Sequence, residues 1–280
     1  MVRAHADLHT HSSGSDGSDS PSEIARKADR IGLGGIALTD HDSLDGLEEF
    51  MNTEVSNELT LVPGLEISAE YKDKEVHILG YYVPLDSKTL NDKLQFLRDA
   101  RHERLPKMIQ KLRDLDVDVT IEELYENLDG VASPGRPHVA QLLVKKGIVK
   151  TNREAFQKYL AADKPAYVKK ERMKAKDAVR LLSSVGAAPV LAHPLTIKLP
   201  NLRTVIENLR KEGLVGIEVE YDYSHIVMNI PPVNVRKTVQ DLDLILTGGS
   251  DYHGTVHFTE LGSISVPIEV IDELRRKTIK

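Results

Sequence analysis

Residues 35–42 have the sequence Gly-Ile-Ala-Leu-Thr-Asp-His-Asp, an apolar segment followed by three charged or titratable side chains. Such a short apolar run is typical of a strand that is buried on both faces, as in a parallel sheet. The preceding segment Ser20–Arg30 predicts a helix, because Ser20 and Glu23 form a capping box and Pro21 takes the first helical position. These residues therefore predict one helix and one strand of a repeated βα unit.

The same alternation of short apolar segments with helical patterns covers most of the 280 residues. The other strands are expected at Arg3–Leu8, Leu59–Ile67, Glu75–Val83, Ala188–Ala192, Val215–Glu220 and Leu242–Leu246. The other helices are expected at Ser43–Asn57, Lys174–Ser184, Leu202–Glu212 and Pro267–Lys277. Repeated βα units indicate a parallel sheet, and seven strands are enough to close into a barrel. We therefore expect an α/β fold, a (β/α)7 TIM-like barrel.

Residues 89–167 interrupt this alternation, since they show helical patterns and no convincing strand. Apolar residues recur at helical spacing over Leu90–Leu112, and further helices are expected at Pro137–Lys146 and Arg153–Leu160. We expect an all-helical insertion that caps the active site. The corresponding domains are residues 1–88 with 168–280 for the barrel and residues 89–167 for the insertion.

The charge of this insertion differs from that of the whole chain, which has a net charge of −6. Between Gly130 and Lys170, nine Lys or Arg residues stand against Glu154 and Asp163, which gives a net charge of +7. Two interpretations stay open. The basic residues form either a solvated helix face or a cap over a polyanionic substrate.

The composition excludes several classes of protein. An excess of 43 acidic over 37 basic residues argues against a general nucleic-acid coat protein. The absence of cysteine excludes disulfides, thiolate catalysis, zinc fingers and iron–sulfur clusters. No apolar run approaches the roughly 20 residues of a membrane helix, and the N-terminus shows no apolar signal segment. We expect a cytoplasmic protein without membrane contact.

Histidines and carboxylates lie at or near the C-terminal ends of the predicted strands. His9 and His11 alternate along the chain, so they share a face and can chelate one metal ion. The further groups of this kind are Asp16, His41, Glu66, His77, His193, Asp251 and His253. In a parallel barrel these strand ends form the active-site face. We expect a metal centre there, with Asp40 orienting a ligand rather than binding the metal.

Seven motifs carry these side chains: Asp7-Leu-His-Thr-His11-Ser12, Ser15-Asp16-Gly17, Thr39-Asp-His-Asp42, Gly64-Leu-Glu66-Ile-Ser68, Val76-His77-Ile78, Ala192-His193-Pro194 and Gly249-Ser-Asp251-Tyr-His253. Together they resemble the motifs of the PHP (polymerase and histidinol phosphatase) family of metal-dependent phosphoesterases. Within that family, Gly135-Arg136-Pro-His138 in the insertion is similar to the branch that contains 3′,5′-nucleoside bisphosphate phosphatases and 5′→3′ exoribonucleases.

The resemblance implies a distorted seven-stranded barrel with a trinuclear metal site. By position, His9, His11, Glu66 and Asp251 hold the first ion, Glu66, His77 and His193 hold the second, and Asp16, His41 and His253 hold the third. We expect two or three divalent ions, namely Mn²⁺, Zn²⁺ or Fe²⁺. The histidinol phosphatase branch often has a histidine at the position of Asp16, and the carboxylate here suits an oxygen-preferring third ion such as Mn²⁺.

The resemblance also implies hydrolysis of nucleotide phosphomonoesters by attack of a hydroxide that bridges two metal ions. Nucleoside 3′,5′-bisphosphates are the expected substrates. Arg136 offers a bidentate fork for a second phosphate, which the metal ions alone do not bind. His138 is expected to donate to a phosphate or to protonate the leaving oxygen. His225 is expected to face the substrate, and Asp40 to support catalysis.

Other functions stay open. A 5′→3′ exoribonuclease acting on short 5′-phosphorylated RNA would share the catalytic site. Tyr159 and Tyr167 would then stack on bases, although an aromatic content of 5% disfavours binding of long single strands. Histidinol phosphate phosphatase and a non-catalytic metal-binding module are further alternatives. The expected partner is a small phosphorylated substrate, a nucleotide or short oligoribonucleotide, and no obligate protein partner is inferred.

Overall fold

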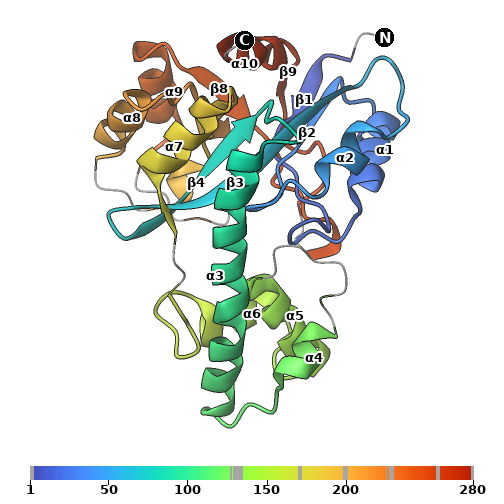
Figure 1. Cartoon of the computed structure of the whole chain (residues 1–280), viewed down its shortest axis with the longest axis vertical. Coiled ribbons are helices and arrows are strands. Elements are labelled where there is room, and N and C mark those ends of the chain that lie inside the picture. The colour runs from blue at the N-terminus through green and yellow to red at the C-terminus, as the bar shows by residue number, and fades with distance from the viewer. Residues whose placement is uncertain are drawn as a thin grey trace.

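The computed structural model of the chain describes residues 3–126, 128, 135–169, 172–197, 201–224, 226, 230–256 and 259–278, apart from the side chains of residues 100 and 101. Figure 1 shows a sheet surrounded by helices and a smaller, purely helical part below it. The long helix α3 (Lys88–Arg113) runs through both parts. None of the helices in these ranges combines the length and the apolar character that crossing a membrane requires.

Within the described residues, nine strands form one sheet. They are β1 (His5–Asp7), β2 (Gly35–Leu38), β3 (Thr60–Tyr71), β4 (Lys74–Tyr81), β5 (Met173–Lys174), β6 (Ala188–Leu191), β7 (Gly216–Glu220), β8 (Ile245–Gly248) and β9 (Val266–Pro267). Their order is β8-β7-β6-β4-β3-β2-β1-β9, and β5 pairs with β3. The N–H of Leu8, just after β1, donates to the carbonyl of Gly248 in β8 at 3.2 Å. The sheet is thus nearly closed, and the expected TIM-like barrel is confirmed.

The expectation of a parallel sheet is wrong for β4, which runs antiparallel to both β3 and β6. Lys72 and Asp73 join β3 to β4 with φ angles of +47° and +62°. A two-residue loop with positive φ at both positions matches the twist of an antiparallel hairpin. Because of this hairpin, His77 near the start of β4 lies opposite Ser68 of β3. Glu66 lies in the middle of β3, and not at its C-terminal end as expected.

Six α-helices accompany the sheet: α1 (Pro21–Ile31), α2 (Leu47–Met51), α7 (Ala175–Ser184), α8 (Leu202–Arg210), α9 (Pro232–Asp241) and α10 (Glu269–Lys277), counted within the described ranges. The expected helix Ser43–Asn57 is wrong in length, because the structure forms only the short α2 there. Helix α9 is an addition to the expected helices. It begins at Pro232, in the first turn where proline is tolerated, and buries Val235 in the core. The strand expected at Leu242–Leu246 begins later, at Ile245.

The helical part contains the shorter elements α4 (Ile121–Tyr125), α5 (Arg136–Lys145), α6 (Asn152–Ala155) and the π-helical turn η1 (Phe156–Leu160). It has a hydrophobic core of its own, to which α3 contributes Leu105 and Leu112. The first half of α3 instead buries Leu90 and Leu94 in the core of the barrel. Helix α3 therefore belongs to both cores, and the limits of 89–167 as a separate insertion stay a prediction.

Candidate metal centre

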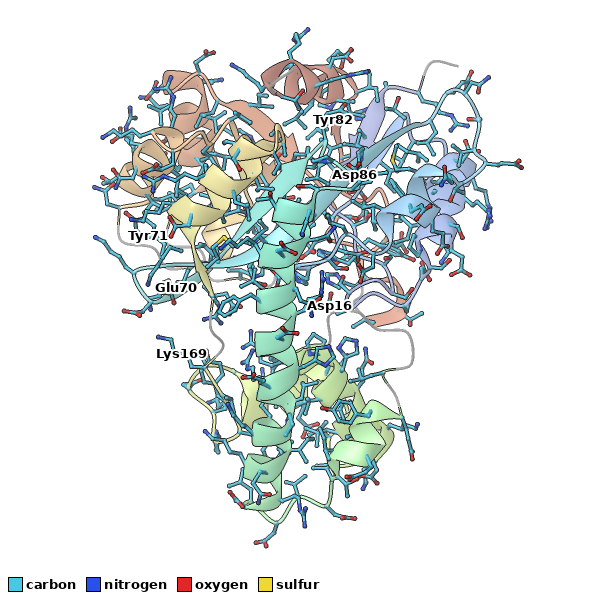
Figure 2. The ribbon with its side chains drawn as sticks, viewed as in Figure 1. Asp16, Glu70, Tyr71, Tyr82, Asp86 and Lys169 are labelled. Carbon is cyan, nitrogen blue, oxygen red and sulfur yellow. The ribbon has the colours of Figure 1, made fainter. Side chains whose placement is uncertain are left out.

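The nine predicted metal ligands gather at the side of the barrel that faces the helical part. Figure 2 labels Asp16 in this position, between the sheet and the helices below it. The nine side chains form four overlapping groups whose ligand atoms lie within 4.8 Å of one another. The groups are His11 with Asp16, His41 and His253; His9 with Glu66 and His193; His9 with His11 and Asp251; and His41 with Glu66 and His77.

His9 and His11 follow β1 and point in the same direction, as predicted. Thr10 between them points the opposite way, and its hydroxyl donates to the carbonyl of Ala37 in β2 at 2.7 Å. Alternation along an extended chain thus brings both rings to the centre. Their Nε2 atoms lie 3.1 Å apart.

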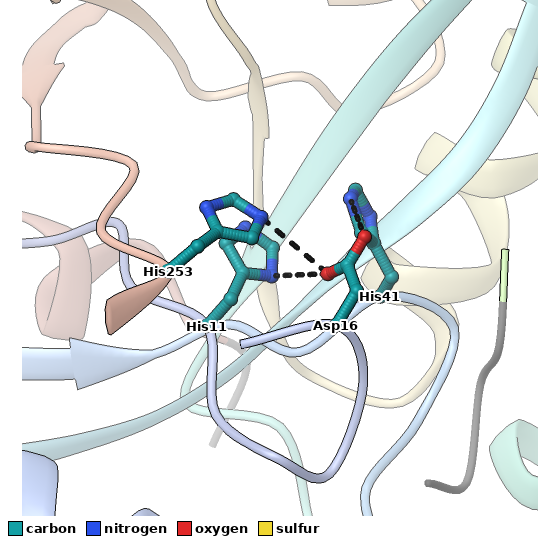
Figure 3. Close-up of side chains that lie close together, drawn as sticks. All are labelled: His11, Asp16, His41 and His253. Atoms are coloured by element: carbon teal, nitrogen blue, oxygen red, sulfur yellow. Dashed lines mark ion pairs between the residues drawn. The ribbon is translucent and has the colours of Figure 1, made fainter. Parts of the chain in front are cut away.

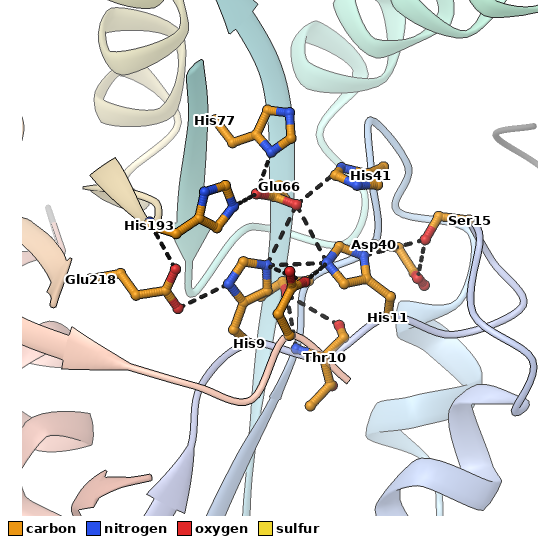
Figure 4. A network of polar contacts seen from close by, with 12 residues as sticks. His9, Thr10, His11, Ser15, Asp40, His41, Glu66, His77, His193 and Glu218 are labelled. Carbon is orange, nitrogen blue, oxygen red and sulfur yellow. Dashed lines mark hydrogen bonds and ion pairs between the residues drawn. The ribbon is translucent and has the colours of Figure 1, made fainter. Parts of the chain in front are cut away.

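Glu66 is the carboxylate in the middle of the centre, and it is 1% exposed. Figure 4 shows the rings that surround it. Its Oε1 lies 2.8 Å from His77 Nδ1 and 3.0 Å from His193 Nε2. Its Oε2 lies 3.0 Å from His41 Nδ1 and 3.3 Å from His11 Nε2. Oε2 also lies 3.4 Å from His9 Nε2. The two oxygens thus face different sets of rings, an arrangement that suits a carboxylate bridging two cations.

The donors of His9, His11 and Asp251 are spaced like ligands of a single ion. Asp251 Oδ1 lies 3.3 Å from His9 Nε2 and 3.2 Å from His11 Nε2. Ligand atoms about 2.1 Å from one ion, at angles of about 90–109°, lie about 3.0–3.4 Å apart. The separations of these three donor atoms fall within this range, so the residues fit a metal ion.

Asp16 meets a further set of rings, shown in Figure 3. Its Oδ1 lies 3.4 Å from His253 Nε2, and its Oδ2 lies 4.0 Å from His41 Nε2. Asp16 Oδ1, His41 Nδ1 and His77 Nδ1 are buried without a hydrogen-bond partner among the described residues. Although the two rings lie close to Glu66, neither contact has the angles of a hydrogen bond. Because buried polar atoms are nearly always satisfied, these atoms suit coordination of a cation.

The histidines and carboxylates of the centre shift each other's pKa values. Burial raises the pKa of Glu66, but the charges of His77 and His41 outweigh it and hold this pKa well below its usual range. Burial lowers the pKa of His11, yet hydrogen bonds with Asp251 and Glu66 raise it to about 10. Burial also lowers the pKa of His77, but the charge of Glu66 raises it to about 9. The protons compete with a cation for these ring nitrogens, so metal binding releases protons.

The profile of the PHP domain matches residues 7–164, which is more than half of the chain. The chain belongs to the PHP family. The 3′,5′-nucleoside bisphosphate phosphatase of Chromobacterium violaceum is 33% identical over 254 residues, which cover 89% of this chain and 87% of that protein. The 5′-3′ exoribonuclease of Haemophilus influenzae is 28% identical over 91% of this chain and 92% of its own length.

A solved structure has the same fold. It comes from Bifidobacterium adolescentis, is assigned as a metal-dependent phosphoesterase, and matches with a TM-score of 0.89 at 25% identity. The match covers 98% of this chain and 96% of that one. The present PHP protein is therefore a hydrolase of phosphoester bonds, and its buried histidine and carboxylate cluster supports binding of divalent metal.

Glu218 of β7 contacts the PHP centre, although sequence reasoning missed it. Its buried carboxylate accepts hydrogen bonds from His9 Nδ1 and from the backbone N–H of His193, both at 2.9 Å (Figure 4). The Nε2 lone pair of His9 consequently faces the centre, as a metal ligand requires. A register shift in β7 turns Glu220 outward to Arg236. The signal available in the sequence was a glutamate in the middle of a short strand whose neighbouring residues are apolar.

Asp40 anchors the loop that leads to Asp16. Its carboxylate accepts from the N–H and the hydroxyl of Ser12 at 2.7 and 2.6 Å, and from the hydroxyl of Ser15 at 2.7 Å. Burial raises the pKa of Asp40. These contacts hold the loop that carries Asp16, and the hydroxyl of Ser15 also lies 3.5 Å from His11 Nδ1. The expected role of Asp40 in catalysis stays a prediction.

Asp7 anchors the loop on the other side of the PHP centre. Its carboxylate accepts from the N–H and the hydroxyl of Ser250 at 2.9 and 2.6 Å, and burial raises the pKa of Asp7 to about 6. Asp251, which follows Ser250 in the chain, has a φ of +54° and accepts a hydrogen bond from the hydroxyl of Tyr221 at 2.9 Å. His193 also has a positive φ, of +24°. Strained backbone of this kind is common at functional sites.

A cavity of about 120 Å³ adjoins the PHP centre; its lining includes Asp16, His41, Glu75, His77, Arg104 and Arg136. Arg136, distant in sequence, is thus brought next to the centre, where its Nη2 lies 3.3 Å from Glu75 Oε2. His138 Nδ1 instead accepts from the N–H of Gly135 at 3.1 Å and caps helix α5. Contact of His138 with substrate stays a prediction. His225 lies outside the described residues, and its expected role also stays a prediction.

Proposed function

We propose that this PHP protein removes the 3′-phosphate of nucleoside 3′,5′-bisphosphates by metal-dependent hydrolysis. The observation that carries the proposal is Arg136, a guanidinium in the wall of the cavity that also borders His41 and His77. A guanidinium binds a phosphate through two parallel hydrogen bonds, and it can hold a second phosphate while the metal centre binds the first. The name of the Chromobacterium violaceum relative agrees with this substrate class.

The proposed cofactors are two or three divalent ions, Mn²⁺, Zn²⁺ or Fe²⁺. The proposed ligands are His9, His11, Glu66 and Asp251 for one ion, Glu66, His77 and His193 for a second, and Asp16, His41 and His253 for a third. Imidazole and carboxylate donors suit these metals. When bound, such ions lower the pKa of coordinated water and neutralise phosphoryl oxygens.

The protein side chains contribute orientation. Glu218 holds His9 with its Nε2 toward the centre, and Arg136 would align the substrate through the phosphate that is not hydrolysed. Because the N–H of Gly135 donates to His138 Nδ1, the neutral His138 ring carries its proton on Nε2. That atom is the proposed donor to the substrate or to the leaving oxygen.

A substrate panel in Mn²⁺ tests the proposal. It contains adenosine 3′,5′-bisphosphate, a 5′-phosphorylated oligoribonucleotide, histidinol phosphate and an aryl phosphate. The proposal expects the highest kcat/KM for the bisphosphate, with inorganic phosphate and adenosine 5′-monophosphate as products. A higher kcat/KM for histidinol phosphate or for the aryl phosphate would contradict it.

A 5′→3′ exoribonuclease is the second candidate, because the Haemophilus influenzae relative with this name matches almost the whole chain. The position of Tyr167 argues against binding of long RNA, because its ring already packs against the guanidinium groups of Arg104 and Arg136. That ring face is not open to a base. Release of mononucleotides from the 5′ end in the panel would favour this candidate. A cytoplasmic site of action, expected from the sequence, remains part of the proposal.

A further inference from the structure

Arg104 of helix α3 is a buried cation without an acidic partner among the described residues. It lines the cavity beside the metal centre and is 7% exposed. Its Nε and Nη2 atoms are buried and have no hydrogen-bond acceptor in the same part of the chain. A guanidinium has five N–H donors and no acceptor, so Arg104 offers unused donors beside the cavity.

The surroundings make the charge of Arg104 unfavourable. Burial, followed by the nearby charge of Arg136, lowers the pKa of Arg104 to about 10. The charge of Glu75 offsets these effects only in part, and a buried charge without an ion-paired partner is strongly destabilising. An arginine in this position is therefore typical of a binding site in which the ligand supplies the negative charge.

Two more arginines accompany Arg104. The Nη2 atoms of Arg136 and Arg172 lie 3.3 and 2.7 Å from Glu75 Oε2, and the side chain of Arg172 is 3% exposed. The ring centre of Tyr167 lies 5.3 Å from Arg104 Cζ and 5.8 Å from Arg136 Cζ. By cation–π contact, this ring holds the two guanidinium groups near each other. The four charged side chains thus form one cluster from four different segments of the chain.

We infer that Arg104, Arg136 and Arg172 form a subsite for a terminal phosphate, and that Glu75 sets the charge which this subsite accepts. The inference rests on the proposed function and deepens it, since it names the group that binds beside the phosphate being hydrolysed. Three guanidinium groups and one carboxylate leave a net charge of +2. A phosphate monoester carries about −1.5 to −2 at pH 7, whereas a diester carries about −1. The subsite therefore favours a terminal phosphate over an internal one.

Glu75 also connects the subsite to the metal centre. Its Oε1 lies 3.8 Å from His77 Nε2, and the two residues share a face of β4. The carboxylate keeps Arg136 and Arg172 in place before a substrate arrives. A phosphate held by the arginines would therefore lie next to a proposed metal ligand, which is the arrangement that a small bisphosphate requires.

The kinetic test compares adenosine 3′,5′-bisphosphate with adenosine 3′-monophosphate, which differ only in the 5′-phosphate. Arg104→Gln is expected to lower kcat/KM for the bisphosphate about 10- to 150-fold, the effect of losing charge-assisted hydrogen bonds, and to spare the monophosphate. Arg104→Lys keeps the positive charge but not the two parallel N–H donors of the guanidinium, so it should recover part of the loss. Arg113→Gln, on the exposed end of the same helix, is the matched control and should change neither substrate. Equal losses on both substrates would overturn the inference.

Binding to the metal-free protein tests the subsite without turnover. We expect calorimetry to show tighter binding of adenosine 5′-monophosphate than of its methyl ester, and the same 10- to 150-fold loss in Arg104→Gln. Glu75→Gln is expected to bind the methyl ester more tightly than the wild type does, because it removes the opposing charge. Equal binding of the two ligands by the wild type would overturn the subsite, and weaker binding by Glu75→Gln would overturn the role of Glu75. Absence of phosphatase activity together with weakened binding in Arg104→Gln would refute the proposed function and leave the subsite standing.

Discussion

Glu218→Gln removes one charge beside the metal centre and keeps nearly the same side-chain size. Both oxygens of Glu218 accept hydrogen bonds at 2.9 Å, one from His9 Nδ1 and the other from the N–H of His193. A glutamine amide has a single oxygen. Because the backbone N–H of His193 cannot become an acceptor, the oxygen takes this contact and the NH2 group faces His9. His9 must then accept on Nδ1 and carry its proton on Nε2, the atom that faces the centre.

We expect this change to lower the affinity for Mn²⁺ about 10- to 100-fold, which is the usual effect of losing a partner of a metal-bound histidine. This factor corresponds to about 1.4–2.7 kcal/mol. Calorimetric titration of the metal-free protein measures it directly, and metal analysis after dialysis counts the ions that remain. Turnover should recover in part when the Mn²⁺ concentration is raised.

Glu220→Gln is the matched control for this experiment. It lies two residues further along β7, but its carboxylate contacts Arg236 on the outside of the barrel. It should leave the affinity for Mn²⁺ unchanged. If Glu218→Gln binds Mn²⁺ as tightly as the wild type and the control do, the reasoning about the tautomer of His9 is refuted. Thermal unfolding of the metal-free variants shows separately whether the fold is intact.

Three further experiments address the centre and the cavity. Glu66→Ala should lose at least one equivalent of metal and nearly all turnover, since both carboxylate oxygens face the cluster; an unchanged metal count by elemental analysis would contradict the bridging assignment. Arg136→Ala should lower kcat/KM on nucleoside bisphosphates about 10- to 150-fold and change little on an aryl phosphate, with partial recovery in Arg136→Lys; equal losses would place Arg136 on the reacting phosphate. The affinity for Mn²⁺ should rise with pH from about 7 to 9, because the raised pKa values of His77 and His11 keep protons on the rings at lower pH. Calorimetry in buffers of different ionisation enthalpy should detect the release of these protons, and an affinity independent of pH would contradict this expectation.

The antiparallel strand β4 shows where reasoning from repeats fails. The predicted strands Leu59–Ile67 and Glu75–Val83 are separated by seven residues, whereas a parallel crossover needs a dozen or more. The short separation favoured a hairpin, and the turn Lys72-Asp73 forms one. Glu66 and His77 nevertheless lie in the region that was expected for them, because the hairpin brings the start of β4 to the edge at which the parallel strands end.

The ligand set and its supporting residues differ in how far the sequence can reveal them. His9 and His11 are neighbours in an extended segment, so their common direction follows from local alternation. Glu218 and His9 are 209 positions apart, and the hydrogen bond between them depends on how β7 and β1 meet in the closed barrel. Arg104 is one of several arginines and lysines in a long helix. That it has no ion pair with any described residue is a property of the packed structure alone.

Helix α3 makes the recognition of substrate depend on the stability of the helical part. Leu94 is anchored in the core of the barrel and Met108 in the other core, with Arg104 between them. Melting of the helical core would release the turn that carries Arg104, while the strands that bear the histidines would keep their own packing. A chimera that combines the barrel of one relative with the helical part of another therefore has to keep α3 whole and place the junction after Arg113. Natural divergence of substrate preference faces the same constraint, because Arg104 on this shared helix acts together with Arg136 and Tyr167 from the segment that follows it.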